Sequence, residues 1–252
     1  MNEDSGNREG RGVQFYTDGS FYEGYFVDDC ANGRGRLIFL DGDMYLGDLI
    51  NNSMNGKGEY YKKDGSSYTG PFIDDLPEGH GEEVWEDGSV YKGDYVRGCK
   101  QGKGIFSFAN GTRYDGDFAT DVFNGDGSLT KPDKMVFKGK WKDGTLTSPG
   151  TINFCNGNVY TGGVDNLLQQ GEGILVDHQV TLKGVWDKGV LNGEVVFKYT
   201  NGNIKRAKYI NGSFDSWIEN ASQFSDPKED KIFIPEPGTS RKNKKIACCT
   251  IF

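Results

Sequence analysis

The stretch NGRGRLIFLDGDMYLGD, residues 32–48, decides the fold of this 252-residue chain. It places two glycines around one residue, then a short apolar run, then Asp41-Gly42, and then Tyr45-Leu46-Gly47. So many glycines among strand-forming residues have two explanations. Either the segment is a flexible linker, or each glycine occupies a position where a side chain does not fit. Recurrence of the pattern elsewhere in the chain separates the two.

The pattern recurs at a constant spacing along the sequence, which equals the number of residues from Tyr22 to Tyr45. An aromatic residue followed two positions later by glycine stands at Tyr22, Tyr45, Tyr68, Tyr91, Tyr114, Phe137 and Tyr160. The next copy has Leu182, one position early, and the pattern fades at Ala207. The Gly-x-Gly and Asp-Gly or Asn-Gly pairs keep the same step. A linker has no reason to keep such a period, so the glycines are structural over about residues 12–210.

The turn pairs predict that each repeat is a β-hairpin. Asp-Gly or Asn-Gly between short runs of alternating large residues is typical of a type I′ turn, in which both central residues have positive φ. Side chains alternate across a strand, so Tyr91, Gly93 and Tyr95 lie on one face. A single hairpin is marginally stable in water, so we expect rings of one repeat to cover the next. Glycines on the ring-bearing face leave room for rings from neighbouring strands.

Composition and charge exclude several classes of protein. The chain is 13% aromatic, which is too much for a disordered polymer, and its formal net charge of −8 disfavours nucleic-acid binding. The first ten residues are polar with Asn at position 2, which argues against a secretory signal and against N-myristoylation. No window approaches the roughly 18 apolar residues of a membrane span. We therefore expect a cytosolic protein whose five cysteines stay reduced.

Together, the Tyr-x-Gly-x-aromatic, Gly-x-Gly and Asn/Asp-Gly elements at this spacing resemble the MORN repeat (membrane occupation and recognition nexus), in about eight copies over some four-fifths of the chain. The resemblance implies an all-β fold, an elongated single-layer array of antiparallel β-hairpins with a mostly irregular C-terminal tail. We expect a disordered N-terminus at residues 1–11, the array at 12–212, a cap or linker at 213–240 and a polybasic lipidated tail at 241–252. The repeat indicates architecture far better than activity.

The tail RKNKKIACCTIF, residues 241–252, predicts lipid attachment. Cys249-Thr250-Ile251-Phe252 has the form of a Cys-aliphatic-aliphatic-X prenylation box, with Thr at the less strict position and a final Phe that favours geranylgeranylation. We therefore predict a prenyl group on Cys249, added by a prenyltransferase, and the methylation that accompanies such processing. Cys248 is a candidate for palmitoylation, which the sequence leaves open. The alternative is an ordinary basic tail that ends in apolar residues by chance.

Basic residues supply the second membrane signal that one lipid chain requires. Four cations near an anionic leaflet are worth roughly 1 kcal/mol each, and they are Arg241, Lys242, Lys244 and Lys245. From Glu219 onward the chain has six Lys/Arg and five Asp/Glu, a net charge of +1, which leaves −9 for residues 1–218. The tail is therefore attracted to anionic lipid and the repeats are not.

No residue pattern indicates catalysis, a cofactor or a metal site. The two histidines, His80 and His178, lie four repeats apart and are interpreted as exposed loop residues. The recurrent turn aspartates are explained by their turn position, and the periodic Gly-x-Gly opens a strand and lacks the Gly-Lys-Ser/Thr of a phosphate loop. Cys30, Cys99 and Cys155 have neither metal-ligand spacing nor a recognisable base. We also predict that three tryptophans anchor the core of the array, namely Trp85, Trp141 and Trp186.

Taken together, these features favour a non-catalytic, lipid-anchored scaffold or adaptor at the cytoplasmic face of the plasma membrane or an endomembrane. Its array would bind a protein partner or another copy of itself. The family resemblance leaves two alternatives open. The array could be a regulatory or substrate-binding subunit of an enzyme, as where such repeats precede a lysine methyltransferase or lipid kinase domain, or it could bind phospholipid directly.

Overall fold

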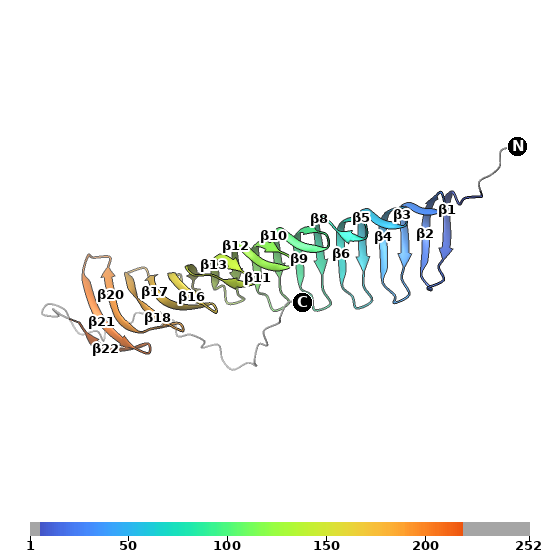
Figure 1. The fold of residues 1–252 in the computed structure, drawn as a ribbon. Coiled ribbons are helices and arrows are strands. Elements are labelled where there is room, and N and C mark those ends of the chain that lie inside the picture. The colour runs from blue at the N-terminus through green and yellow to red at the C-terminus, as the bar shows by residue number, and fades with distance from the viewer. Residues whose placement is uncertain (1–5, 219–252) are drawn as a thin grey trace. The chain divides into compact units, whose positions relative to one another are not determined.

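The structure is a computed structural model that describes residues 6–218. These residues form 22 β-strands and no helix (Figure 1). The expected all-β fold of antiparallel hairpins is confirmed. The chain divides into two compact units, one up to Phe123 and the other from Asn124. The first strand begins at Gly10, two residues before the expected start of the array, and the last strand lies inside the segment expected as a cap or linker.

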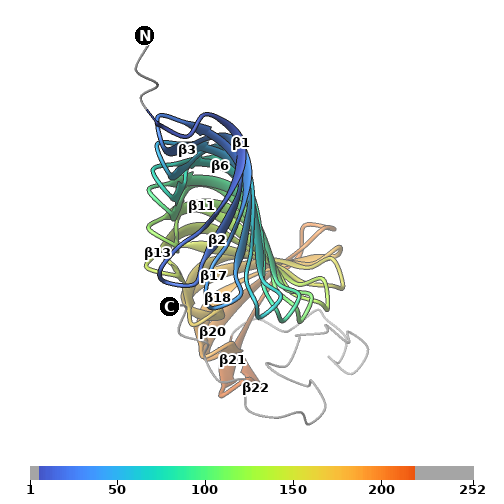
Figure 2. The ribbon, with the colours of Figure 1, turned by 90° about the vertical axis from the view of Figure 1, so that its right-hand side faces the viewer.

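In the first unit, each hairpin pairs with the next in antiparallel order. Figure 2 shows these hairpins, coloured blue to green, lying one behind another with bent strands. The strands are β1 (Gly10–Phe15), β2 (Phe21–Val27), β3 (Cys30–Ile38), β4 (Met44–Ile50), β5 (Ser53–Tyr61), β6 (Ser67–Ile73), β7 (Leu76–Pro77), β8 (Gly79–Val84), β9 (Val90–Val96), β10 (Cys99–Ser107) and β11 (Arg113–Ala119). The division between the units falls within β12 (Val122–Thr130).

The second unit continues the same antiparallel pairing. Its strands are β13 (Val136–Lys142), β14 (Thr145–Leu146), β15 (Gly150–Asn153), β16 (Val159–Asp165), β17 (Leu168–Val176), β18 (Val180–Asp187), β19 (Val190–Leu191), β20 (Gly193–Tyr199), β21 (Ile204–Ile210) and β22 (Ser213–Trp217). Its core includes Trp141 and Trp186, which are 4% and 1% exposed. These two tryptophans are core anchors, as predicted.

The Asp-Gly pairs form three-residue hairpin loops, so the prediction of type I′ turns at these pairs was wrong. In the first loop, Tyr16 N–H donates to Ser20 C=O at 2.9 Å and Gly19 N–H donates to Tyr16 C=O at 3.1 Å. Within this loop only Gly19 has a positive φ, of 89°. Asp18 accepts a hydrogen bond from Ser20 N–H at 2.9 Å. This arrangement is a type I turn closed by glycine in the left-handed region.

Type I′ turns occur instead at the opposite ends of the strands. Asp28 and Asp29 connect β2 to β3 with φ of 48° and 65°, and Asn51 and Asn52 connect β4 to β5 with φ of 49° and 72°. Asp and Asn tolerate the left-handed region better than other side-chain-bearing residues, which explains their use here. We call the edge that holds these turns the two-residue-turn edge.

Each of these turns binds the preceding repeat. Ala31 N–H donates to Asn52 Oδ1 at 2.8 Å, and Asn52 N–H donates to Ala31 C=O at 3.0 Å. Asp75 makes the same reciprocal pair with Met54, at 2.7 and 3.1 Å. The two partners of each pair are 21 residues apart, and Lys100 and Asp121 form a further such pair, so adjacent repeats are joined at this edge by more than strand pairing.

The glycine pairs accommodate tyrosine rings. Tyr45 is fully buried and its ring covers Gly47 on its own strand and Gly58 on the next strand. A Cβ on either glycine would lie less than 3.0 Å from the ring or its hydroxyl, closer than real Cβ atoms approach. The Tyr45 hydroxyl donates to Asp48 C=O at 2.8 Å. The expectation that these glycines leave room for a ring is confirmed, and the ring belongs to one of the two glycine-bearing strands.

We call the sheet surface that carries these tyrosines the aromatic face, and the other surface the opposite face. Successive repeats contact one another across the aromatic face through edge-to-face ring pairs. The ring centroids are 5.2 Å apart for Tyr45 and Phe72, and 5.2 Å apart for Tyr68 and Tyr95. Such pairs contribute about 0.5–1.5 kcal/mol beyond the burial of apolar area. The aromatic rings therefore hold neighbouring hairpins together, as expected from the composition.

Candidate binding site on the aromatic face

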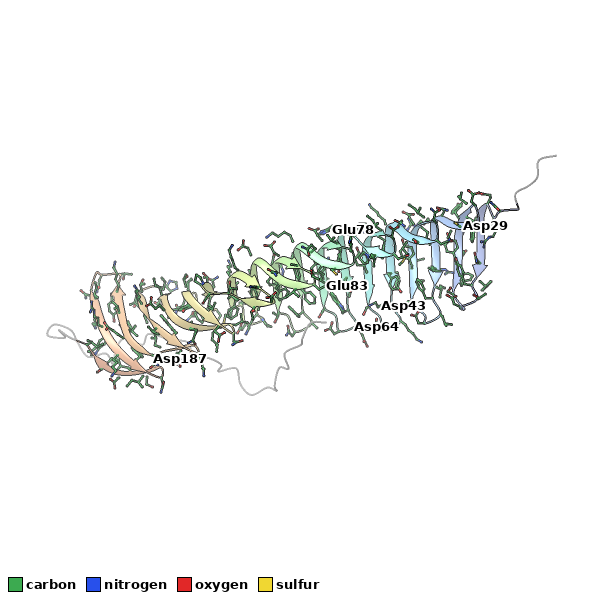
Figure 3. The ribbon with its side chains drawn as sticks, viewed as in Figure 1. Asp29, Asp43, Asp64, Glu78, Glu83 and Asp187 are labelled. Carbon is green, nitrogen blue, oxygen red and sulfur yellow. The ribbon has the colours of Figure 1, made fainter. Side chains whose placement is uncertain are left out.

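Two charged residues stand on the aromatic face at positions that neighbouring repeats fill with apolar side chains. Glu83 lies on β8, and its counterparts one repeat before and after it are Tyr60 and Phe106. Lys100 lies on β10, and its counterparts are Pro77 and Phe123. Figure 3 places Glu83 between the edge that carries Glu78 and the edge that carries Asp64. The substitutions therefore bring opposite charges onto an otherwise aromatic surface.

The two charges form an ion pair. Lys100 Nζ lies 2.9 Å from Glu83 Oε2 and 3.7 Å from Asp121 Oδ1. The Lys100 and Glu83 side chains are 13% and 22% exposed, so water screens the pair only in part. Tyr95 donates its hydroxyl hydrogen to Glu83 Oε2 at 2.9 Å. Burial raises the pKa of the Tyr95 hydroxyl well above its usual range, and the Glu83 carboxylate raises it further.

Aromatic rings surround the Lys100 ammonium. Its nitrogen lies 4.8 Å from the ring centroid of Trp85, 5.3 Å from that of Tyr91 and 5.6 Å from that of Tyr95. Ring faces attract cations at these distances, so they offset part of the cost of removing the ammonium from water. Trp85 is half-buried, and its role differs from the predicted one: its ring packs against the Lys100 ammonium and is not a core anchor.

A hollow of about 360 Å³ opens beside the ion pair. Its apolar walls include Tyr60, Tyr68, Phe72 and Tyr95, and its polar lining includes Glu83 and Lys100. A site of this size with aromatic walls and a few fixed polar groups suits one or two side chains of a bound segment. The arrangement can therefore bind an apolar side chain against the rings and orient a polar group at the ion pair.

The residues predicted to carry lipid or to contact the membrane lie outside the described residues. They are Cys248, Cys249, Arg241, Lys242, Lys244 and Lys245. Over residues 6–218 the chain has no helix that is both long and apolar enough to cross a membrane. Within the same range, no group of three or more His, Cys, Asp or Glu side chains is placed to hold a metal ion.

No histidine or cysteine among the described residues lines this hollow. His80 is exposed and its Nδ1 lies 3.0 Å from Asp94 Oδ1, but it stands on strand β8 and not in a loop as predicted. His178 is exposed in the bend before β18. Cys30 and Cys99 are half-buried strand residues, and Cys155 is exposed. Sequence reasoning missed Glu83 and Lys100, although comparison of equivalent positions in successive repeats would have revealed them.

Comparison with known proteins identifies the class of repeat. The MORN repeat profile matches residues 5–21, 22–44, 45–67, 68–90, 91–113 and 137–159, just over half of the chain. The chain belongs to the MORN-repeat family. The profile recognises six copies where we expected about eight, and the copies that it leaves out include residues 114–136 and those after 159. No curated protein matches the chain.

Two solved structures share a limited likeness with this fold. One is the wild-type TCP10 domain of Danio rerio CPAP, at 12% identity and a TM-score of 0.48, covering 83% of this chain and all of that domain. The other is the TCP domain of Drosophila melanogaster SAS-4 in complex with a proline-rich motif of Ana2, at 13% identity and a TM-score of 0.37, covering 61% of this chain and 90% of that one. Both scores lie below 0.5, so nothing about binding follows from them.

Proposed function

We propose that this MORN-repeat protein is a non-catalytic scaffold that binds a protein partner on its aromatic face, at the hollow beside Glu83 and Lys100. The observation that carries the proposal is the ion pair itself, set among aromatic rings where equivalent positions are apolar. The partner is a polypeptide segment that presents an apolar side chain to the rings and a polar group to the pair.

The free-energy cost of placing an ion pair in a partly buried site supports this proposal. Removing two charges from water is expensive, and well-packed apolar residues in the same place are often neutral or stabilising. The other repeats show that apolar residues fit these positions, because Leu37 and Phe106 replace Glu83 there. The fold therefore does not require the ion pair. Fixed charges in a partly desolvated site instead discriminate between partners, since a partner without a matching polar group removes water from the ion pair and offers it no hydrogen bond in return.

Quantitative affinity purification from cells tests this proposal. The variant Glu83→Leu with Lys100→Met replaces the pair by apolar residues of similar size, as other repeats use at these positions. The matched control is Glu82→Leu with Lys92→Met, which removes an exposed ion pair of 2.8 Å from the opposite face. We expect the first variant to lose a partner that the wild type and the control retain. Equal recovery of every partner by all three proteins would exclude the site.

Attachment to a membrane completes the proposed function. The motif Cys249-Thr250-Ile251-Phe252 supports a prenyl group on Cys249, and Cys248 is the proposed palmitoyl site. The nearby cations, Arg241, Lys242, Lys244 and Lys245, would hold the tail to an anionic cytoplasmic leaflet. Intact-mass measurement of the protein from eukaryotic cells, with fractionation of Cys249→Ser, tests the anchor. An unmodified mass and unchanged membrane recovery would refute it without affecting the binding site.

A further inference from the structure

A row of aliphatic side chains runs along the opposite face of the first unit. They are the last residues of β2, β4, β6 and β9, namely Val27, Ile50, Ile73 and Val96. Their exposed fractions are 48%, 55%, 54% and 47%. Each repeat adds two strands, so neighbours in this row are about 10 Å apart. Their strand partners are Cys30, Ser53, Leu76 and Cys99, of which the first three stand between these four residues. We call Val27, Ile50, Ile73 and Val96 the aliphatic row.

The fold does not require aliphatic residues at these positions. In the second unit three of the four equivalent strands, β13, β16 and β18, end in Lys142, Asp165 and Asp187, while β21 ends in Ile210, and all four pair in the same way. Charged residues therefore suit a solvent-facing position at this strand end. Four successive aliphatic residues on one exposed surface of the first unit instead mark a surface that associates with another molecule.

The order of side chains in the row fits a second copy of the same chain. It reads Val-Ile-Ile-Val along β2, β4, β6 and β9, which is the same in both directions. A two-fold axis parallel to the strands and beside β5 places Ile50 against Ile73 of the second copy and Val27 against Val96 of the second copy. The residue nearest this axis is Ser53, whose small side chain allows close approach. A surface that matches itself in this way forms a closed two-fold interface.

Charges beside the row match under the same axis. Asp28 follows Val27, and Arg97 follows Val96, each as the first residue of a two-residue turn with φ of 48° and 50°. The axis brings Asp28 beside Arg97 of the second copy, and Arg97 beside Asp28 of the second copy. Among the described residues, the Arg97 guanidinium has no hydrogen-bond or ion-pair partner within its own chain. Both ends of the interface therefore pair opposite charges.

We propose that two copies of this chain associate through the aliphatic row, with their opposite faces in contact and their repeats running in opposite directions. Apolar strips of two sheets then pack at the usual separation of about 10 Å. The aromatic face is not used, so the partner site at Glu83 and Lys100 stays open on each copy. This interface is independent of the proposed partner site and of the lipidated tail.

Sedimentation velocity of the full chain over about 1–100 µM tests the interface. We expect a monomer–dimer equilibrium for the wild type. Ile50→Thr with Ile73→Thr keeps β-branched side chains but is expected to weaken dimerisation by about a hundredfold or more. The matched control is Ile174→Thr, an exposed isoleucine on β17 outside the row that is 40% exposed. It should dimerise like the wild type.

A charge exchange tests the orientation. Arg97→Asp alone is expected to weaken the dimer by about tenfold, and Asp28→Arg added to it should restore the wild-type affinity. The backbone permits both changes, because each residue already occupies the same turn position in the other repeat. A wild type that stays monomeric would overturn the proposal and leave the row to a different partner. A dimer that survives the double isoleucine change, or a charge exchange without recovery, would also overturn it.

Discussion

The ring of Tyr45 occupies the space where a side chain of Gly58 would begin, because a Cβ there would lie less than 3.0 Å from the ring. The two residues stand on neighbouring strands, β4 and β5. The same relationship joins Tyr22 to Gly35, Tyr68 to Gly81, and Tyr91 to Gly104. Each of these repeats therefore gives up side chains at the glycines that one buried ring covers, which explains the glycines of the aromatic face.

Gly58→Ala should destabilise the protein by about 1–3 kcal/mol, because the new methyl group must displace a buried ring. Gly65→Asn is the control. Gly65 has a φ of 94° and a Cβ there would have no neighbour within 4 Å, and Asn tolerates the left-handed region better than other side-chain-bearing residues. We expect that change to cost less than about 1 kcal/mol. Urea unfolding measures both variants, and equal stability of the two would contradict the role of the ring.

Asn52→Gly should destabilise the first unit by about 1 kcal/mol, because the Ala31 N–H loses its acceptor while the turn keeps its conformation. Asn52→Asp should have no measurable effect, since Asp75 makes the same contact in the next repeat. Thermal unfolding of the two variants beside the wild type checks this. Equal melting temperatures for Asn52→Asp and Asn52→Gly would contradict a stabilising role for this hydrogen bond between repeats.

Lys100→Met should destabilise the protein by about 1–3 kcal/mol, because Glu83 keeps its charge in a partly desolvated site without its cation. Adding Glu83→Leu should recover most of that loss. A double-mutant cycle on unfolding free energies measures the coupling. The exposed pair Glu82 and Lys92 is the control, with an expected coupling of about 0–1 kcal/mol. Equal coupling in the two cycles would show that burial adds nothing to the inner pair.

Stability should fall as pH rises from 10 to 12. Burial raises the pKa of Tyr68 and of Tyr160 from 10.0 to about 12. A raised pKa in the folded state means that folding favours the protonated phenol. The resulting stability is complete below pH 10 and is lost as pH rises through about 12. Tyrosinate absorbance and melting temperature, followed together, check this. Titration of every tyrosine near pH 10 without loss of structure would contradict the burial of these rings.

The constant repeat spacing was sufficient to predict the hairpins and their ring-bearing face. This succeeded because tyrosine, glycine and turn residues each report a local steric requirement, and the requirement repeats with the chain. The type of turn could not be predicted in the same way. Asp18-Gly19 suits both a two-residue and a three-residue loop, and the choice depends on how Tyr16 and Ser20 pair across the hairpin. The two-residue turns at Asp28-Asp29 and Asn51-Asn52 were not predicted, because they contain no glycine and the prediction of type I′ turns relied on Asp-Gly and Asn-Gly pairs.

Glu83 and Lys100 could not be paired from local sequence. They lie on different strands, β8 and β10, and strand register decides that their side chains meet on one face. The available signal is a departure from the repeat, because Glu83 and Lys100 carry charges at positions where neighbouring repeats have apolar side chains, and the fold does not require a charge there. The aliphatic row shows the converse, since its members are apolar at positions that carry charges in later repeats.

Photo-crosslinking from position 85 tests the central claim most directly. Trp85 is half-buried and its ring centroid lies 4.8 Å from the Lys100 ammonium, so a benzoyl-phenylalanine placed there stands beside the ion pair at which the partner is proposed to bind. The control position is Lys92 on the opposite face. In cells, we predict a discrete protein adduct from position 85 that disappears with Glu83→Leu and Lys100→Met and is absent from position 92. An adduct that forms only from position 92, or one from position 85 that persists without the ion pair, would contradict the proposed scaffold site.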